Sequence, residues 1–194
     1  MKKILPLLIL LLTASSASAQ LFKGRDKTLD KAEYQVGAVP EVNGKVVFEE
    51  SFAAKGDSKE IAAKAQEWVK KRFAGSNVIK HNIYENEKPG TLTLKSEEYI
   101  TFKKKTFVLD RTRITYFLDI EAKDNACTMR MYRITYWYDE EFKGGEHFTA
   151  EKYITDNEAF NSSKTKLLKK PGKFRVKTFD LKNQLAAELK NALN

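Results

Sequence analysis

Cysteine and histidine are scarce in this chain of 194 residues, which contains one cysteine and two histidines. A single cysteine excludes an intrachain disulfide framework and a cysteine-rich zinc site, and two histidines cannot form a three-histidine metal centre. The sequence also has no H-E-x-x-H, G-x-S-x-G, P-loop or G-x-G-x-x-G pattern. We therefore expect a non-catalytic protein with no metal site and no cofactor. An enzyme that works through His147 or a carboxylate is the weakest alternative, because no spacing singles out an acid–base pair.

A long hydrophobic run is also missing. Residues 4–12 are apolar apart from Pro6, and this run is much shorter than the roughly 20 residues that cross a bilayer. Lys2 and Lys3 precede the run and the small residues 17–19 follow it, which is the pattern of a cleavable signal peptide. We expect a signal peptide at residues 1–19, export to a periplasmic or extracellular space, no integral membrane span and no contact with genomic DNA.

The pattern of the remaining chain predicts one α+β domain over residues 41–194, preceded by residues 20–40. The latter have no clear hydrophobic period, so we expect a flexible leader or, alternatively, an irregular arm that docks on the domain. Within the domain, alternating apolar residues predict strands, and Asp57 with Glu60 forms a capping box before a helical pattern. In chain order we expect strand 45–52, helix 58–73, strands 78–84, 91–103, 111–122 and 127–138, an irregular basic segment over residues 139–178, and helix 180–193.

This β-α-β-β-β-β-α order predicts two layers, because a helix between one strand and a run of hairpins packs most easily on one face of a single sheet. A turn at residues 124–125 then sets the register of the last hairpin. It places Phe117 opposite Tyr132 and Arg113 opposite Tyr136, on the face that the helices leave free. That face therefore carries aromatic rings and arginines suited to stacking and anion contacts. Its candidate ligand-binding residues are Arg113, Phe117, Arg130, Tyr132 and Tyr136. Either this face is open, or residues 139–175 cover it.

A second candidate site is the run of basic residues near the C-terminus. Without Lys2 and Lys3 the chain has 33 basic and 26 acidic residues, and residues 164–177 alone contain seven basic residues and no acid. This segment therefore equals the whole positive excess of the processed chain. Such a cluster can attract polyanions, or it can be a solvated surface without a ligand. Its members are Lys164, Lys166, Lys169, Lys170, Lys173, Arg175 and Lys177.

Four short segments also carry a resemblance to a known family. They are residues 37–48 (GAVPEVNGKVVF), 63–68 (AKAQEW), 154–156 (ITD) and 172–175 (GKFR). In these segments the chain resembles a family of secreted bacterial proteins, the domain-of-unknown-function family DUF 4468, over roughly residue 40 to the C-terminus. The resemblance implies a TATA-binding-protein-like fold, a curved antiparallel sheet with helices on one face. It implies no activity and no catalytic residue, and a shared fold does not imply a shared function.

These observations predict an exported, non-catalytic domain that binds a protein or another component of the cell envelope. The alternative is a polyanion-binding protein whose ligand is lipopolysaccharide, an acidic glycan or nucleic acid. It would use the basic segment together with the aromatic face.

Overall fold

A computed structural model describes residues 31–194 except residues 85, 87, 89 and 107. The predicted signal peptide at residues 1–19 and the first part of the predicted leader lie outside the described residues. Among the described residues, no helix is long and apolar enough to cross a membrane.

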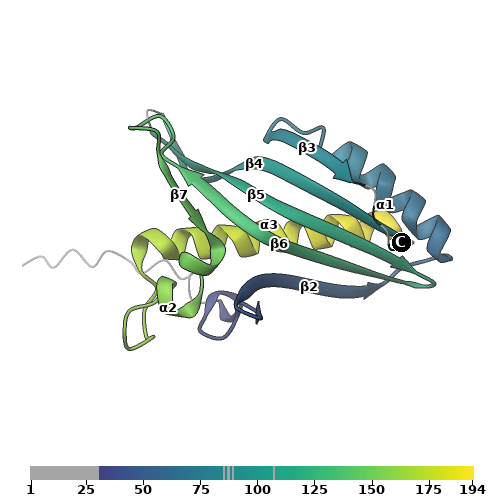
Figure 1. Cartoon of the computed structure of the whole chain (residues 1–194), viewed down its shortest axis with the longest axis horizontal. Helices are drawn as coiled ribbons and strands as arrows, with labels where there is room; N and C mark the ends of the chain where they lie inside the picture. The colour runs from purple at the N-terminus through teal and green to yellow at the C-terminus, as the bar shows by residue number, and fades with distance from the viewer. Residues whose placement is uncertain (1–30, 85, 87, 89, 107) are drawn as a thin grey trace, which may run out of the picture.

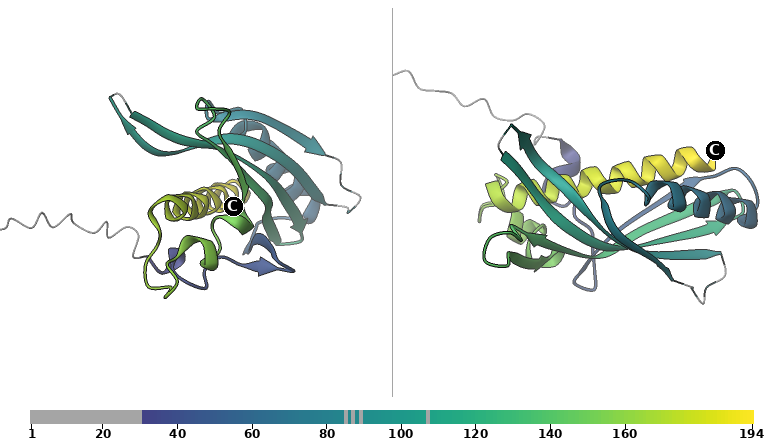
Figure 2. Two further views of the ribbon diagram at one scale, coloured as in Figure 1. Left: turned by 60° about the vertical axis from the view of Figure 1, so that its left-hand side comes forward. Right: turned by 90° about the horizontal axis from the view of Figure 1, so that it is seen from above.

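The domain is a seven-stranded antiparallel sheet with two long helices on one face (Figures 1 and 2). Six strands follow the order β1-β2-β6-β5-β4-β3, and β7 pairs with β6 beyond the end of β2. The strands are β1 (Glu41–Val42), β2 (Lys45–Ala53), β3 (Val78–Tyr84), β4 (Thr91–Lys105), β5 (Val108–Lys123), β6 (Ala126–Tyr138) and β7 (Glu146–Thr149). The helices are α1 (Ser58–Arg72), α2 (Asp156–Ala159) and α3 (Lys169–Leu193), with 3-10 turns η2 (Ala32–Tyr34) and η3 (Ala150–Lys152).

The predicted two-layer α+β fold is confirmed. Each of the five expected strands is present, and the capping box of α1 forms as predicted, with Asp57 accepting from Lys59 and Glu60 while Glu60 accepts from the Asp57 N–H. Figure 2 shows α1 and α3 on the same side of a curved sheet. The core lies between these layers, where α1 packs on β5 and β4, and α3 packs on β4 and β2. Alternate residues of β5 are buried on this side. The other alternate residues of β5 are half-exposed on the opposite face.

A buried carboxylate, that of Glu98, lies inside this core. Glu98 of β4 is 3% exposed, and its carboxylate accepts from Arg72 of α1 at 2.9 Å and from the Tyr116 hydroxyl of β5. Burial alone would lower the pKa of Arg72, but Glu98 outweighs that effect and leaves it above its ordinary value. The buried carboxylate is therefore satisfied by a cation and a hydroxyl, as a buried charge requires.

The C-terminal helix is eleven residues longer than predicted, because α3 begins at Lys169 and not at Asp180. Pro171 and Gly172 fall in the segment predicted to be irregular, but they lie inside this helix and do not break it. Pro171 lies in the first turn of α3, where a backbone N–H has no helical partner and proline costs nothing. Within the predicted irregular segment 139–178, β7, η3 and α2 are short regular elements, and α3 begins at Lys169.

The register of β5 and β6 agrees with the prediction from the turn as far as Phe117 and Tyr132, and then shifts. A β-bulge adds one residue to β6 at Arg133, whose φ is 51°. Beyond the bulge Arg113 pairs with Trp137, and Tyr136 pairs with Ile114. The predicted pairing of Arg113 with Tyr136 is thus wrong, because one extra residue moves every later side chain to the other face.

Residues 31–40 form an arm that docks on α3, the second of the two alternatives for the leader. Tyr34 is 2% exposed and donates to Asp180 at 2.7 Å. Arg175 of α3, which is 0% exposed, donates to the carbonyls of Tyr34 and Gln35 and pairs with Asp156 at 2.8 Å. Asp156 in turn accepts from the Gly37 N–H at 2.7 Å. The prediction of a flexible leader is therefore wrong for residues 31–40.

Candidate ligand-binding face

The outer face, as we call the face of the sheet turned away from α1 and α3, carries most of the aromatic and arginine residues that the sequence singled out. Figure 1 views the sheet from this face, with both long helices behind it. In the described part of the chain, residues 139–168 reach only one end of it. There β7 extends the sheet beside β6, and Glu140 contacts Tyr99 and Arg113. The rest of the outer face is open.

Three aromatic rings form a row across the open part of this face. Tyr84 of β3, Phe117 of β5 and Tyr132 of β6 lie side by side, with ring centroids 6.1 Å apart for the first pair and 5.7 Å for the second. Phe117 and Tyr132 are half-exposed, and Tyr84 is exposed. The Tyr132 hydroxyl donates to Asp119, and burial together with this carboxylate raises the pKa of Tyr132. We call these three residues the aromatic row.

Cationic side chains surround the aromatic row. The Arg133 guanidinium lies 5.3 Å from the Phe117 centroid and 5.9 Å from the Tyr132 centroid. The Lys95 ammonium is 5.8 Å from the Phe117 centroid, and the Arg130 guanidinium is 5.7 Å from that of Tyr132. Arg130 also pairs with Glu49 at 3.2 Å, but both are exposed, so this contact is weak. Within the described chain, Lys95 and Arg133 have no carboxylate partner.

A hollow of about 570 Å³ adjoins the aromatic row at the bulge. It lies where β6 has left β2 and has not yet met β7, and Tyr132 and Arg133 form part of its wall. Lys45 and Arg130 add two more cations, and Glu151 is the single acid of the lining. Glu151 already accepts a hydrogen bond from the Val46 N–H at 3.0 Å. The hollow can therefore accept one ring-shaped unit and an anionic group beside it.

At the other end of the outer face, carboxylates of the protein itself neutralise the charge of Arg113. Arg113 pairs with Glu97 at 2.9 Å and with Glu140 at 2.6 Å, and these carboxylates raise the pKa of its guanidinium. Trp137 donates to the Gly144 carbonyl and stacks on His147, with centroids 4.9 Å apart. Arg113 is thus on the outer face as predicted, but it is saturated by protein carboxylates. Glu146, the neighbour of His147, pairs with Lys170 and not with the imidazole.

The predicted basic segment is not one surface. Four of its seven residues pair with carboxylates outside the run: Lys170 with Glu146, Lys173 with Asp110, Arg175 with Asp156, and Lys177 with Asp180 three residues further along α3. Arg175 is buried, so its assignment as a ligand-binding residue is wrong. Lys164, Lys166 and Lys169 are exposed and have no ion pair within the described chain. The pairs of Arg175 and Lys173 are buried or half-buried, whereas those of Lys170 and Lys177 are exposed and therefore weaker.

Tyr136, another predicted ligand-binding residue, does not lie on the outer face. Its side chain is 2% exposed in the core, packs at 5.2 Å from the Phe174 ring and shares a 2.6 Å hydrogen bond with Thr178. Phe117, Arg130 and Tyr132 lie together on the outer face, as the register predicted.

The prediction missed Tyr84, Lys95 and Arg133. One signal could have revealed Arg133: apolar residues occupy odd positions of β6 up to Met131 and even positions from Ile134, and such a phase change indicates a bulge. The other two belong to strands whose register a single sequence leaves open. No group of three or more potential metal ligands gathers within the described residues.

Comparison with known proteins places the chain in a family. A family model described as "Domain of unknown function (DUF4468) with TBP-like fold" matches residues 48–137. A crystal structure of a DUF4468 family protein from Bacteroides ovatus ATCC 8483 is 32% identical, with a TM-score of 0.76 over 88% of this chain and 96% of that chain. The chain belongs to the DUF4468 family.

A second crystal structure supports the fold assignment. A TBP-like protein from Parabacteroides distasonis ATCC 8503 is 26% identical, with a TM-score of 0.65 over 80% of this chain and 96% of that chain. No curated protein matches the chain significantly. The predicted resemblance and the TBP-like α+β fold are thereby confirmed. The DUF4468 model spans β2 to β6, so it includes Phe117, Tyr132 and Arg133 and leaves out all of α3.

Proposed function

We propose that this DUF4468 protein is an exported, non-catalytic binding module, and that its ligand is an acidic glycan of the cell envelope bound on the outer face. The signal-peptide pattern of residues 1–19 supports export. One observation supports the ligand most directly. Arg133 lies over Phe117 and Tyr132 without a carboxylate partner among the described residues, at the wall of a 570 Å³ hollow.

The chemistry of this corner suits an acidic sugar. A tyrosine ring offers an apolar face for the C–H side of a sugar ring, and its hydroxyl offers a polar edge. A guanidinium beside it can take a sugar carboxylate through two parallel hydrogen bonds. The row from Tyr84 to Tyr132 repeats the ring surface across three strands, which suits an extended chain of such units.

Calorimetric titration of the processed protein with an oligogalacturonate and with a neutral glucan of equal length tests this proposal. We expect binding of the acidic chain only, with an affinity that falls as salt shortens the Debye length from about 10 Å at 0.1 M to about 3 Å at 1 M. Arg133→Asn is the sharpest variant, because asparagine accepts the positive φ of this position. It should weaken binding at least tenfold, roughly 1.4 kcal/mol.

Lys164→Asn is the matched control, since it removes an exposed cation at a position whose φ is also positive, far from the aromatic row. It should leave the affinity unchanged. Equal losses in the two variants would show attraction by net charge alone and would contradict the proposal. Tighter binding of a single-stranded oligonucleotide than of the oligogalacturonate would replace the glycan with a nucleic acid.

Binding of a protein partner is a second candidate function, favoured by the exposure of β3 at the edge of the sheet. This strand lies at the edge of the sheet, and six of its seven residues are exposed. Ile79, Ile83 and Tyr84 are 40%, 45% and 43% exposed. An exposed edge with apolar side chains is a template for a strand from another chain. We therefore propose an extended segment of an envelope protein as the partner at this edge.

Hydrogen exchange of β3 amides, with and without envelope proteins of the producing cell, tests this second candidate. Added strand pairing should protect these amides, and Ile83→Lys should remove the protection. Val108→Lys, at an exposed position of β5 outside this edge, is the control and should retain it. Unchanged exchange of β3 in the presence of the envelope proteins would contradict a partner at this edge.

A further inference from the structure

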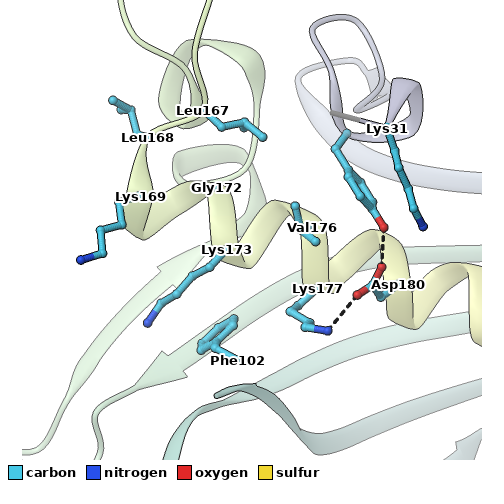
Figure 3. Close-up of a pocket in the computed structure, with 11 residues that line it drawn as sticks. Lys31, Phe102, Leu167, Leu168, Lys169, Gly172, Lys173, Val176, Lys177 and Asp180 are labelled. Carbon is cyan, nitrogen blue, oxygen red and sulfur yellow. Dashed lines mark hydrogen bonds and ion pairs between the residues drawn. The ribbon is translucent and has the colours of Figure 1, made fainter. Parts of the chain in front are cut away.

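A groove of about 540 Å³ runs along the first part of α3, on the opposite side of the molecule's core from the outer face. We call it the α3 groove. Figure 3 shows its lining residues spaced along α3 from Lys169 to Asp180, with Phe102 of β4 on one side and Lys31 of the arm on another. This stretch of helix is roughly 16 Å long at 1.5 Å per residue. The groove is therefore elongated and of the size of a small-molecule site.

The α3 groove has an apolar wall. Phe102, Leu167, Leu168 and Val176 contribute to its lining, and apolar atoms outweigh polar ones on its surface. Leu168 is 41% exposed, one of the large hydrophobic residues that the fold leaves in contact with water. An apolar ligand in the groove would remove this surface from water, which is the main favourable contribution to binding of an alkyl chain.

The charges around the α3 groove leave one cation unmatched. Four lysines line it, and three of them contact carboxylates: Lys31 with Glu33, Lys173 with Asp110 and Lys177 with Asp180. The Lys173 ammonium also lies 4.4 Å from the centroids of Phe102 and Tyr138, which holds it in place. Lys169, at the N-terminal end of the helix, has no such partner within the described chain. One lysine of the groove, Lys169, is thus without a carboxylate partner among the described residues, which is complementary to a ligand with a single negative charge.

We propose that the α3 groove binds a free fatty acid, with its carboxylate at Lys169 and its alkyl chain along the wall formed by Leu168, Val176 and Phe102. This site is separate from the outer face and does not depend on the function proposed for it. An elongated apolar groove with one unmatched ammonium at one end is complementary to a molecule with one anionic head and one tail. A polyanion would instead require several unmatched cations, and the groove does not offer them.

Calorimetric titration with saturated fatty acids of eight to twelve carbons, each below its aggregation concentration, tests this proposal. Affinity should rise with chain length by up to about fourfold per methylene, the value for full burial of each group. The twelve-carbon alcohol should bind more weakly than the twelve-carbon acid, because it lacks the charge that Lys169 would meet.

Two variants address the head and the wall. Lys169→Glu should weaken binding of the twelve-carbon acid at least tenfold, while Lys164→Glu, an equal charge change at an exposed residue outside the groove, should not. Leu168→Asp should also weaken binding at least tenfold. Leu168 is the N-cap residue of α3 and makes no capping hydrogen bond, and aspartate is favoured at that position. This variant should therefore retain or raise the melting temperature, so a loss of binding would not reflect unfolding.

Arg133→Asn, on the outer face, should leave fatty acid binding unchanged, which separates this proposal from the glycan proposal. Absence of binding by the unmodified protein would overturn the inference. So would equal binding by the unmodified protein, Lys169→Glu and Leu168→Asp. Cosedimentation with phosphatidylglycerol vesicles, lost in Leu168→Asp, would replace the free fatty acid with a membrane surface.

Discussion

The outer face and the N-terminal half of α3 both carry several basic side chains, but the two regions differ in how many of these cations form ion pairs within the protein. On α3, Lys170, Lys173 and Arg175 pair with carboxylates of other elements, and Lys177 pairs with Asp180 one turn further along the same helix. Arg175 is also fully buried. On the outer face Lys95 and Arg133 lie beside aromatic rings and meet no carboxylate within the described residues. A cation that meets only rings can still pair with an anionic ligand, whereas Arg175 and Lys173 already have a carboxylate in a buried or half-buried pair. The N-terminal half of α3 has more basic residues in sequence than the outer face, yet its charges are less available to a ligand.

The largest expected effect contrasts two tyrosines of the same strand. Tyr136→Ala should lower the free energy of unfolding by about 4 kcal/mol, because it empties a buried aromatic site and removes the hydrogen bond to Thr178. Tyr132→Ala, on the outer face, should cost less than about 1.5 kcal/mol, because its ring is half-exposed. Urea denaturation of both variants measures this difference. Similar losses would show that the two faces of β6 are not as distinct as the structure has them.

The second prediction contrasts two arginines that the sequence assigned to ligand binding. Arg175→Met should cost about 3 kcal/mol, since it removes the buried cation that pairs with Asp156 and the donor to the Tyr34 and Ile154 carbonyls. It should also speed hydrogen exchange over residues 31–40, because the arm loses its attachment to α3. Arg130→Met should change the stability by no more than about 0.5 kcal/mol. A stable Arg175→Met protein with a protected arm would contradict this account of the arm.

The third prediction concerns variants that remove the carboxylate partners of two lysines in the basic segment. The double variant Asp110→Asn, Glu146→Gln frees Lys173 and Lys170 and should tighten heparin binding roughly fivefold, about 1 kcal/mol. The double variant Glu41→Gln, Glu158→Gln changes the net charge equally at two exposed residues outside the segment. It should have a smaller effect on heparin affinity. Equal gains in the two variants would mean that net charge, and not release of particular lysines, controls polyanion binding.

The smallest expected effect concerns the neutralised end of the outer face. Burial raises the pKa of Glu140, but the hydrogen bond from Tyr99 and the ion pair with Arg113 outweigh it and leave the pKa below the ordinary 4.5. A lowered pKa means that the folded state favours the carboxylate, so its contribution to stability is complete above about pH 4.5 and is lost as the pH falls through the folded pKa.

Glu140→Gln should therefore cost less than about 1 kcal/mol at pH 7, and the cost should shrink towards zero near pH 3. Chemical denaturation at a series of pH values measures this difference. Glu141→Gln, which changes the exposed neighbouring residue, should show no such pH dependence. A cost for Glu140→Gln that is the same at pH 7 and pH 3 would contradict the role assigned to Tyr99 and Arg113.

Local patterns predicted much of the fold, and the two main errors have local causes. Alternation identified five strands, and the capping box placed the start of α1, because both signals arise from neighbours in sequence. Pro171 was misplaced because proline breaks a helix interior but is accepted in the first turn, and only the position of the N-cap distinguishes these cases. Tyr136 was misplaced because a single bulge at Arg133 inverted the faces of the remaining strand.

The sequence by itself determined the α+β class, the family resemblance and the presence of aromatic and arginine residues on adjacent strands. Only the tertiary structure decided which of the charges are available. The partners Asp110, Glu146, Asp156 and Asp180 come from four different elements or loops, and none stands within the run 164–177 that they neutralise. Coulomb attraction depends on distance in space and on burial, and neither quantity can be counted along a chain. A surplus of seven positive charges in sequence therefore became one buried arginine, three paired lysines and three free ones.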